Sequence, residues 1–166
     1  MTKGKCDYCS QVISGTAMDK HLFTCSKSPY TTTKQRQHSE HRQNRGRAHD
    51  GIFLIGICAT ELPLYWMFIE ANGSTTLEIL DKFLRKTWLE CCGHMSHFVI
   101  RNARYERYHT DDDFGDAENK TMKVPIGKIL SLGDVFHHEY DYGTTTYLQL
   151  KVFAVRRGTV ASRLFL

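Results

Sequence analysis

The hydrophobic residues of this 166-residue chain fall mostly into short runs with period-two spacing, which is typical of β-strands with one buried face. The longest apolar run extends from Ile52 to Ile69. A turn-like stretch at residues 59–63 interrupts it, so the run predicts two strands joined by a turn. Glu61 and Pro63 stand near its middle, which argues against a single membrane-spanning segment.

Further strands are expected in the second half of the chain. Residues 146–155 alternate apolar and polar side chains, and residues 135–141 precede them across a glycine-containing turn, so these two segments predict adjacent strands. Two shorter strands are expected at His97–Ile100 and around Tyr105. Residues 111–116 contain four aspartates and predict a polar loop.

Two helices are expected between these strands. The first begins with Thr75 as its N-cap and has Glu78 three residues later, which predicts a capping box, and it ends near residues 92–93. A shorter helix is expected at residues 124–132. The apolar residues of the longer helix recur at helical spacing and predict its buried face: Leu77, Leu80, Leu84 and Trp88. The charged residues between them predict its solvent-facing side: Asp81, Lys82, Arg85 and Lys86.

The order of these elements, ββαββαββ, predicts an α+β domain with a mainly antiparallel sheet packed with one long and one short helix. The domain would occupy residues 51–166, a length sufficient to bury a core. Composition agrees, because 41% of the chain is apolar and 24% is charged, as in soluble globular proteins. Nothing before the first motif resembles a signal peptide, so we expect a cytoplasmic protein with reduced cysteines and no membrane insertion.

The N-terminal segment carries a zinc-finger-like pattern. Two residues separate Cys6 from Cys9, and His21 and Cys25 follow with a spacing of four. Thiolates and imidazoles are the ligands that Zn²⁺ prefers, and on a helix His21 and Cys25 share one face. Four protein ligands leave no open position, so residues 1–27 predict a small zinc finger of the Cys-Cys-His-Cys type with one structural Zn²⁺. The alternative is a set of free thiols near an unrelated histidine.

Positive charge is concentrated in the first 50 residues. They contain nine Lys and Arg against four Asp and Glu, whereas residues 51–166 contain thirteen against fourteen. Residues 28–50 lack apolar periodicity and predict a flexible basic linker, which either contacts phosphates or serves as a solvated spacer. The candidate nucleic-acid contacts are one finger residue and five linker residues: Lys20, Lys34, Arg36, Arg42, Arg45 and Arg47.

Two further groups contain metal-binding residue types without a firm ligand spacing. The first comprises Cys91, Cys92, His94 and His97. Side chains of adjacent cysteines diverge by about 100° on a helix, which disfavours joint coordination of one ion, so packing at the helix end is the preferred interpretation. The second group would suit a divalent-metal hydrolase: Asp111, Asp112, Asp113, Asp116, His137, His138 and Asp141.

Two observations argue against a shared metal site in this second group. His137 and His138 are neighbours on a predicted strand and therefore point to opposite faces. Asp141 lies in a hairpin, where an aspartate commonly bonds nearby backbone amides. Tyr140 and Tyr142 flank this hairpin and could stack on bases, but shaping the turn is the favoured role.

Two segments resemble motifs of the plasmid pRi ORF-three-like domain family. Leu77 to Phe98 resembles the helix and the "H-L-x-x-F" strand of that family, and Tyr140–Gly143 followed by Thr146–Leu148 resembles its "Y-D-F-G-D" hairpin. Thr144 departs from the second motif, where the family has an acidic residue. The resemblance covers roughly residues 51–155 and implies a compact α+β fold. It also implies a prokaryotic or mobile-element setting, because members occur as TnpR-like passenger genes of insertion elements, but it implies no reaction.

These features favour a non-enzymatic, zinc-containing binding module. The finger and linker would contact DNA or RNA through phosphates, and the α+β domain would dock a protein partner within a larger nucleoprotein complex. A protein–protein adaptor with a purely structural zinc is the alternative, and a metal-dependent hydrolase acting on nucleic acid is the second alternative. The sequence contains no phosphate-binding loop, nucleophile elbow or His-Glu-x-x-His motif and indicates no small-molecule substrate.

Overall fold

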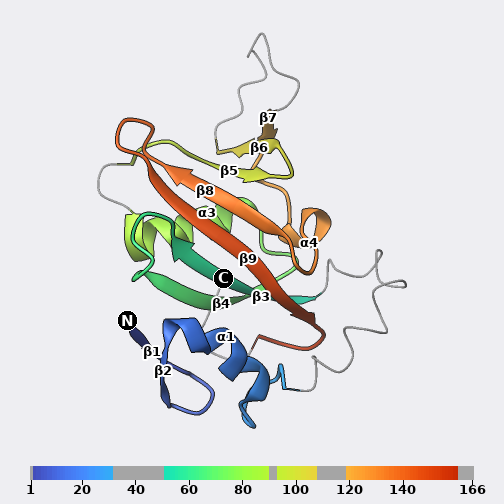
Figure 1. Ribbon diagram of the computed structural model, residues 1–166. Helices are drawn as coiled ribbons and strands as arrows, with labels where there is room; N and C mark the ends of the chain where they lie inside the picture. The colour runs from blue at the N-terminus through green and yellow to red at the C-terminus, as the bar shows by residue number, and fades with distance from the viewer. Residues whose placement is uncertain (1, 32–50, 90–92, 108–118, 161–166) are drawn as a thin grey trace.

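The structure, a computed structural model, describes residues 2–31, 51–89, 93–107 and 119–160 (Figure 1). A seven-stranded sheet dominates these residues, with helix α3 (Leu77–Leu84) on one face and a small N-terminal unit on the other. All neighbouring strands are antiparallel except one pair at the sheet edge. The predicted α+β class with a mainly antiparallel sheet is therefore confirmed.

The strands of the sheet follow the spatial order β4-β3-β9-β8-β5-β6-β7. Their bounds are β3 Ile52–Ala59, β4 Trp66–Asn72, β5 Ser96–Ile100, β6 Ala103–Glu106, β7 Asn119–Thr121, β8 Val135–Tyr140 and β9 Thr146–Arg156. Both long predicted hairpins, β3–β4 and β8–β9, form as expected. The sequence did not predict β7, because its three residues, Asn-Lys-Thr, contain no apolar position.

Strand β9 joins the two halves of the sheet. It pairs with β8, which precedes it in the chain, and with β3, which belongs to the first hairpin. The register of the β3–β9 pair shifts between Leu54 and Ile55, which marks an irregularity in the ladder. Hydrophobic patterning alone did not predict this long-range pairing, since it depends on which faces of the two hairpins are covered.

Helix α3 continues into a π-helical turn, η2 (Arg85–Leu89), and the second helix, α4, spans Ile126–Ile129. The N-cap of α3 is Thr76, whose hydroxyl accepts a hydrogen bond from the amide of Ile79 at 3.3 Å. The prediction of Thr75 as the cap was wrong. Thr75 is buried, and its carbonyl accepts a hydrogen bond from the amide of Ile126, which ties it to α4. The predicted helix end at residues 92–93 falls partly outside the described residues.

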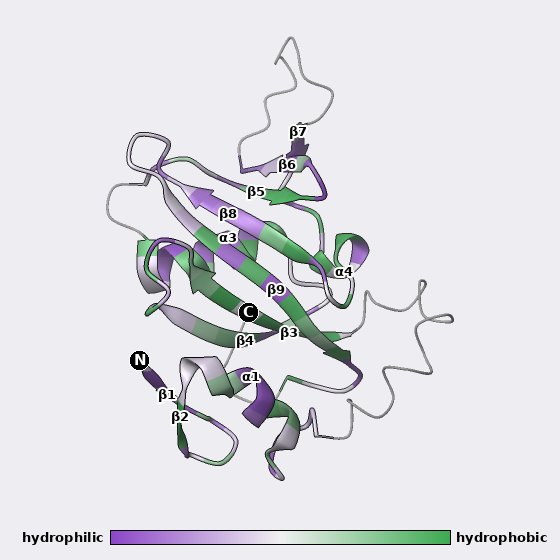
Figure 2. Ribbon diagram, in the orientation of Figure 1, coloured by the Kyte–Doolittle hydropathy of each residue, from purple (hydrophilic) through white to green (hydrophobic). Residues whose placement is uncertain are grey.

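The main core lies between α3 and one face of the sheet. Figure 2 shows β3 as largely hydrophobic and β9 as alternating in hydropathy. Phe53, Ile55 and Ile57 of β3 pack on Leu77, Leu80 and Leu84 of α3. Leu54, between them in sequence, is also buried, because the N-terminal unit covers the opposite face of β3. This two-sided burial explains why the apolar run that forms β3 is nearly continuous.

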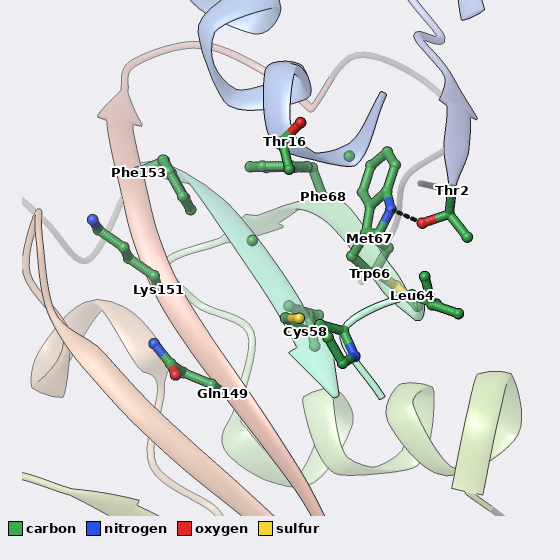
Figure 3. A pocket seen from close by; sticks show the side chains of 14 residues that line it. Thr2, Thr16, Cys58, Leu64, Trp66, Met67, Phe68, Gln149, Lys151 and Phe153 are labelled. Atoms are coloured by element: carbon green, nitrogen blue, oxygen red, sulfur yellow. Dashed lines mark hydrogen bonds between the residues drawn. The ribbon is translucent and has the colours of Figure 1, made fainter. Parts of the chain in front are cut away.

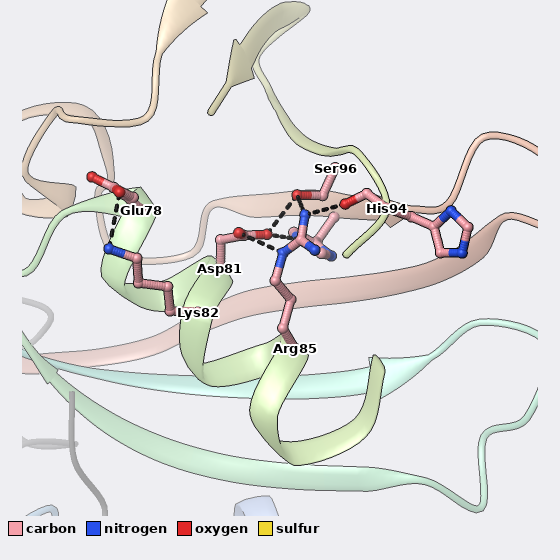
Figure 4. A network of polar contacts seen from close by, with 7 residues as sticks. Glu78, Asp81, Lys82, Arg85, His94 and Ser96 are labelled. Atoms are coloured by element: carbon pink, nitrogen blue, oxygen red, sulfur yellow. Dashed lines mark hydrogen bonds and ion pairs between the residues drawn. The ribbon is translucent and has the colours of Figure 1, made fainter. Parts of the chain in front are cut away.

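A buried polar network links α3 to the sheet (Figure 4). Asp81 accepts hydrogen bonds from Ser96 Oγ at 2.7 Å and His138 Nε2 at 2.8 Å, and Arg85 Nε donates to its other carboxylate oxygen at 2.8 Å. Arg85 also donates to the carbonyl oxygen of His94 at 2.6 Å. Burial raises the pKa of Asp81, but the hydrogen bonds from His138 and Ser96 outweigh it and leave this pKa lowered.

The predicted solvent-facing side of α3 is therefore wrong at two of its four positions. Asp81 is 0% exposed and Arg85 is 5% exposed, whereas Lys82 and Lys86 are exposed as predicted. The physical reason is that polar residues of β5 and β8 face α3 and satisfy this ion pair inside the core. None of the helices in the described residues has the length and apolar character needed to cross a membrane.

Candidate metal centre

The four predicted metal ligands come together in the N-terminal unit. This unit consists of the hairpin β1 (Lys3–Lys5) and β2 (Val12–Ser14), followed by α1 (Gly15–Thr24). The ligand atoms of Cys6, Cys9, His21 and Cys25 all lie within 4.8 Å of one another, so these residues form a group able to hold a metal ion. The predicted finger architecture is thereby supported at all four positions.

The β1–β2 turn positions the first two ligands. The amide of Cys6 donates to the carbonyl of Gln11 at 2.9 Å, and the amide of Ser10 donates back to the carbonyl of Cys6 at 2.7 Å. Ser10 adopts a left-handed backbone conformation, with φ of 64°, which closes the turn tightly. Cys6 and Cys9 therefore project from one compact knuckle.

Helix α1 supplies the other two ligands. His21 occupies its last turn, and Cys25 is the C-cap, with its amide donating to the His21 carbonyl at 2.7 Å. His21 Nε2 lies 3.3 Å from the sulfur of Cys9, so Nε2 is the ring nitrogen that faces this thiol. Met18 and Leu22 on the same helix are buried and hold α1 against the knuckle.

The two thiols of the β1–β2 turn, Cys6 and Cys9, have pKa values shifted in opposite directions. Burial raises the pKa of the Cys6 thiol. The backbone amide of Gln11 lowers the pKa of the Cys9 thiol and so favours its thiolate. A cation placed among the four ligand atoms would stabilise both thiolates, because metal coordination deprotonates thiols.

Glu70 anchors the N-terminal unit to the sheet. This carboxylate on β4 is 1% exposed and accepts hydrogen bonds from Tyr8 at 3.0 Å, Tyr30 at 2.5 Å and Arg156 at 2.8 Å. Tyr8 lies between Cys6 and Cys9, so the knuckle itself contacts the sheet domain. Burial raises the pKa of both tyrosines, and the nearby Glu70 carboxylate adds to this effect.

Tyr30 corrects the predicted start of the linker at residue 28. Its side chain is 0% exposed and packs with Leu54 and Ala154 of the sheet, and Ser28 is also buried. Residues 28–31 therefore belong to the packed unit rather than to a flexible linker. The sequence signal was weak, because a single aromatic residue in a polar stretch shows no periodicity.

Trp66 forms a second contact between the N-terminal unit and the sheet. Its indole Nε1 donates to the hydroxyl of Thr2 at 2.9 Å. A Cβ atom at Gly4 would lie 2.5 Å from the ring, and one at Gly15 would lie 2.3 Å from it. Only glycine fits at these two positions, so the hairpin and α1 are shaped to receive this side chain.

The predicted nucleic-acid contacts are only partly described by the structure. Lys20 is exposed on α1, next to the ligand His21. Lys34, Arg36, Arg42, Arg45 and Arg47 lie outside the described residues. The structure adds three exposed lysines of the N-terminal unit that the sequence pattern did not indicate: Lys3, Lys5 and Lys27.

The group of Cys91, Cys92, His94 and His97, for which packing at the helix end was the preferred interpretation, is only partly described by the structure. Cys91 and Cys92 lie outside the described residues. His94 Nδ1 is 3.5 Å from Asp141, and His97 Nε2 is 3.4 Å from Glu139, so each histidine pairs with a different carboxylate.

The hydrolase candidates are also not assembled in the described part of the chain. Asp111, Asp112, Asp113 and Asp116 lie outside it, and His137 is exposed whereas His138 is 0% exposed, as expected for neighbours on a strand. Asp141 accepts a hydrogen bond from the amide of Gly143 at 3.0 Å, which is the predicted structural role in the hairpin. Tyr142 Oη lies 3.0 Å from His97 Nδ1, so it also contributes to packing at this end of the sheet.

Comparisons with known proteins show a shared fold but no function. Neither the family models nor the curated proteins compared with this sequence match it. Among solved structures, the chain is similar to MM3350, a protein of unknown function from Methanosarcina mazei Go1, with a TM-score of 0.58 and 11% identity. The similarity covers 68% of this chain and 65% of that protein, so this chain spans less than two thirds of its length. The resemblance to the plasmid pRi ORF-three-like family remains a prediction.

Proposed function

We propose that this protein is a zinc-dependent, non-enzymatic module that binds nucleic acid through its N-terminal unit and the basic residues after it. The observation that carries the proposal is the convergence of three cysteines and one histidine within 4.8 Å, in a small unit that carries exposed lysines. The α+β domain would dock a protein partner, which fits an accessory factor of a larger nucleoprotein complex, such as one of a mobile element.

The ligand set favours Zn²⁺ over other metals. Three thiolates and one imidazole in a tetrahedral arrangement are typical of structural zinc sites, whereas Mg²⁺ and Ca²⁺ prefer oxygen ligands. The four residues would complete the coordination shell, so the zinc would stabilise the N-terminal unit without catalysing a reaction.

Exposed lysines support phosphate binding. Lys3, Lys5, Lys20 and Lys27 are all exposed on the N-terminal unit, and Asp7 and Asp19 are the only Asp or Glu among residues 2–31. Phosphate contacts from such side chains give affinity that falls with salt and depends weakly on base sequence. The cations at residues 34–47 would extend this contact along the backbone of the nucleic acid.

Binding assays on the zinc-loaded full chain test the proposal. Fluorescence anisotropy with labelled single- and double-stranded DNA and RNA should show binding that weakens steeply from low to physiological salt. Lys20→Glu should weaken binding and reduce the salt dependence by about one phosphate contact, whereas Lys128→Glu on α4 should leave both unchanged. Native mass spectrometry should find one zinc ion per chain. Absence of binding at low salt would reject the nucleic-acid function.

One observation favours a protein–protein adaptor as the second candidate. Tyr8, Tyr30 and Trp66 fix the N-terminal unit against the sheet, so the metal would brace a composite surface made by both parts of the chain. Under this alternative the lysines would serve solubility. Partner binding that needs zinc, together with no nucleic-acid affinity at any salt concentration, would distinguish it.

A further inference from the structure

A hollow of about 540 Å³ lies where the N-terminal unit meets the outer face of the sheet (Figure 3). Its lining is largely apolar and includes Pro63, Leu64, Trp66, Met67, Phe68 and Phe153. We refer to it as the Trp66 groove. It is separate from the metal centre, because none of the four metal ligands lines it.

The groove is a trough along β3, created by side-chain size. Gly56 is paired with Phe68 on one side and with Lys151 on the other, and Cys58 is likewise paired with Trp66 and Gln149. The rings of Phe68 and Phe153 cover Gly56, where a Cβ atom would lie 2.6 Å from the Phe153 ring. The floor of the trough is therefore accessible at Cys58, which is only partly buried. In Figure 3, Trp66 and Phe68 stand on one side of β3, and Phe153, Lys151 and Gln149 extend from β9 on the other.

One end of the trough is closed and the other has an apolar rim. Thr2, Gly15 and Thr16 of the N-terminal unit form the closed end. At the other end, the β3–β4 connection exposes three large hydrophobic side chains, each more than half exposed to solvent: Leu62, Leu64 and Tyr65. A trough that continues into exposed apolar surface suits a chain segment better than an enclosed small molecule.

Charge at the groove indicates the kind of segment. Lys151 is the charged residue among the fourteen described residues that line it, and no carboxylate is among them. The Lys151 ammonium lies over the ring of Phe153, 5.1 Å from its centroid, at the β9 rim of the trough. Lys3 is exposed next to Thr2, so positive charge flanks the closed end as well. Glu61 is exposed in the β3–β4 connection at the opposite end, so the positive charge lies at the β9 rim and near Thr2. Acidic neighbours of an apolar side chain would be favoured on those two sides of the groove.

From this geometry we propose that the Trp66 groove binds a peptide segment of a partner protein that places an aromatic or aliphatic side chain over Cys58 and beside Trp66, with acidic residues next to it. This proposal rests on the proposed function, in which the α+β domain docks a protein partner, and it identifies the groove as the docking surface. Because Thr2, Gly15 and Thr16 belong to the metal-braced unit, the groove is complete only when that unit is folded on the sheet. Peptide binding should therefore require the bound metal.

Two-dimensional amide NMR of the zinc-loaded full chain provides the test. The probes are short synthetic peptides with phenylalanine or leucine anchors flanked by aspartates, with lysine-flanked and alanine-anchored versions for comparison. The aspartate-flanked, anchored peptides should shift the Trp66 indole resonance, which reports the hydrogen bond to Thr2, and the amide resonance of Cys58. The Trp88 indole resonance should remain in place, since Trp88 packs with the α3 core and does not line the groove.

Matched substitutions separate the groove from general surface effects. Leu64→Asp and Lys151→Glu should each weaken peptide binding about tenfold or more. Two control substitutions introduce the same charge changes at exposed positions away from the groove: Ile79→Asp on α3 and Lys128→Glu on α4. Both variants should keep wild-type peptide affinity. Chelation of the metal should abolish binding.

Several outcomes would overturn the proposal. One is that the aspartate-flanked peptides do not bind, and another is that the lysine-flanked peptides bind equally well. If a simple aromatic acid binds as tightly as the aspartate-flanked peptides, the groove would be a small-molecule site. Groove shifts that grow with protein concentration without peptide would instead assign it to a second copy of the chain. The groove variants should keep wild-type nucleic-acid affinity, so failure of this proposal and failure of nucleic-acid binding are distinguishable.

Discussion

Individual buried polar residues restrict how the segments of this chain can pack together. Glu70, Asp81 and His138 are each at most 1% exposed, and each contacts partners from distant parts of the chain. A buried charge is tolerated only when it is paired and hydrogen-bonded, so each of these residues restricts how its neighbours pack. His97 belongs to the same class at the β5–β8 end of the sheet, where it is 4% exposed.

Stability should depend on pH through His97. Burial, with Arg104 and His138 nearby, lowers its pKa to about 4 from the ordinary 6.5, despite the adjacent Glu139 carboxylate. Between these values the unfolded chain binds a proton that the folded chain does not, so folding stability falls as pH drops from 6.5 to about 4. The loss amounts to about 3.5 kcal/mol at most, at roughly 1.4 kcal/mol per pH unit.

Urea unfolding at a series of pH values measures this dependence. His97→Asn should lower stability at neutral pH and flatten the slope between pH 4 and 6.5. His137→Asn, at an exposed position of β8, is the control and should keep the wild-type slope. An unchanged slope in His97→Asn would show that other histidines account for the pH dependence.

At the scale of elements, α3 is fixed to the sheet by both apolar and polar contacts. Its leucines pack on β3, while Asp81 and Arg85 join it to β5 and β8. The helix changes to π geometry at Arg85, the residue that reaches the carbonyl of His94. The ion pair thus connects the end of α3 to the segment that enters β5.

Asp81→Asn should destabilise the protein strongly. The substitution keeps the shape of the side chain but leaves the buried Arg85 guanidinium without its anion, which costs about 3 kcal/mol or more of unfolding free energy. Glu78→Gln on the same helix removes an exposed pair with Lys82, 2.9 Å apart, and should change stability by about 0.5 kcal/mol or less. Chemical denaturation measures the unfolding free energy of both variants. Equal losses in the two variants would contradict a larger contribution from the buried network than from the exposed pair.

At the scale of the molecule, the N-terminal unit and the sheet domain form one packed body. Tyr8, Tyr30 and Arg156 meet on Glu70, and a second hydrophobic cluster joins Met18 and Leu22 to the outer face of the sheet. The sheet domain has its own larger core around α3. Loss of the metal should therefore affect the two parts unequally.

Chelation should unfold the N-terminal unit while the sheet domain keeps a cooperative thermal transition. Without the metal, the four ligand residues lose the ion that joins them, and the small unit has too little core to remain folded. The Trp66 ring would then lose its packing on Gly4 and Gly15, so its fluorescence should shift to longer wavelength. Trp66→Phe removes this reporter and should abolish the shift, leaving the Trp88 signal. An unchanged Trp66 emission after complete metal removal would contradict this coupling.

The sequence by itself determined the local features of this protein. Ligand spacing indicated Cys6, Cys9, His21 and Cys25, because coordination by closely spaced residues depends on local turns and one helix face. Period-two and helical patterns similarly indicated both main hairpins and α3, since each follows from the burial of one face.

Only the tertiary structure decided the features that depend on contacts between distant segments. Asp81 and Arg85 look solvent-facing in sequence, and Tyr30 looks like part of a linker, yet their partners lie on strands far along the chain. The Trp66 groove likewise requires β4, β3 and β9 to lie side by side beneath the N-terminal unit. Hydrophobic periodicity reports whether a face is buried, but it does not report which other segment buries it.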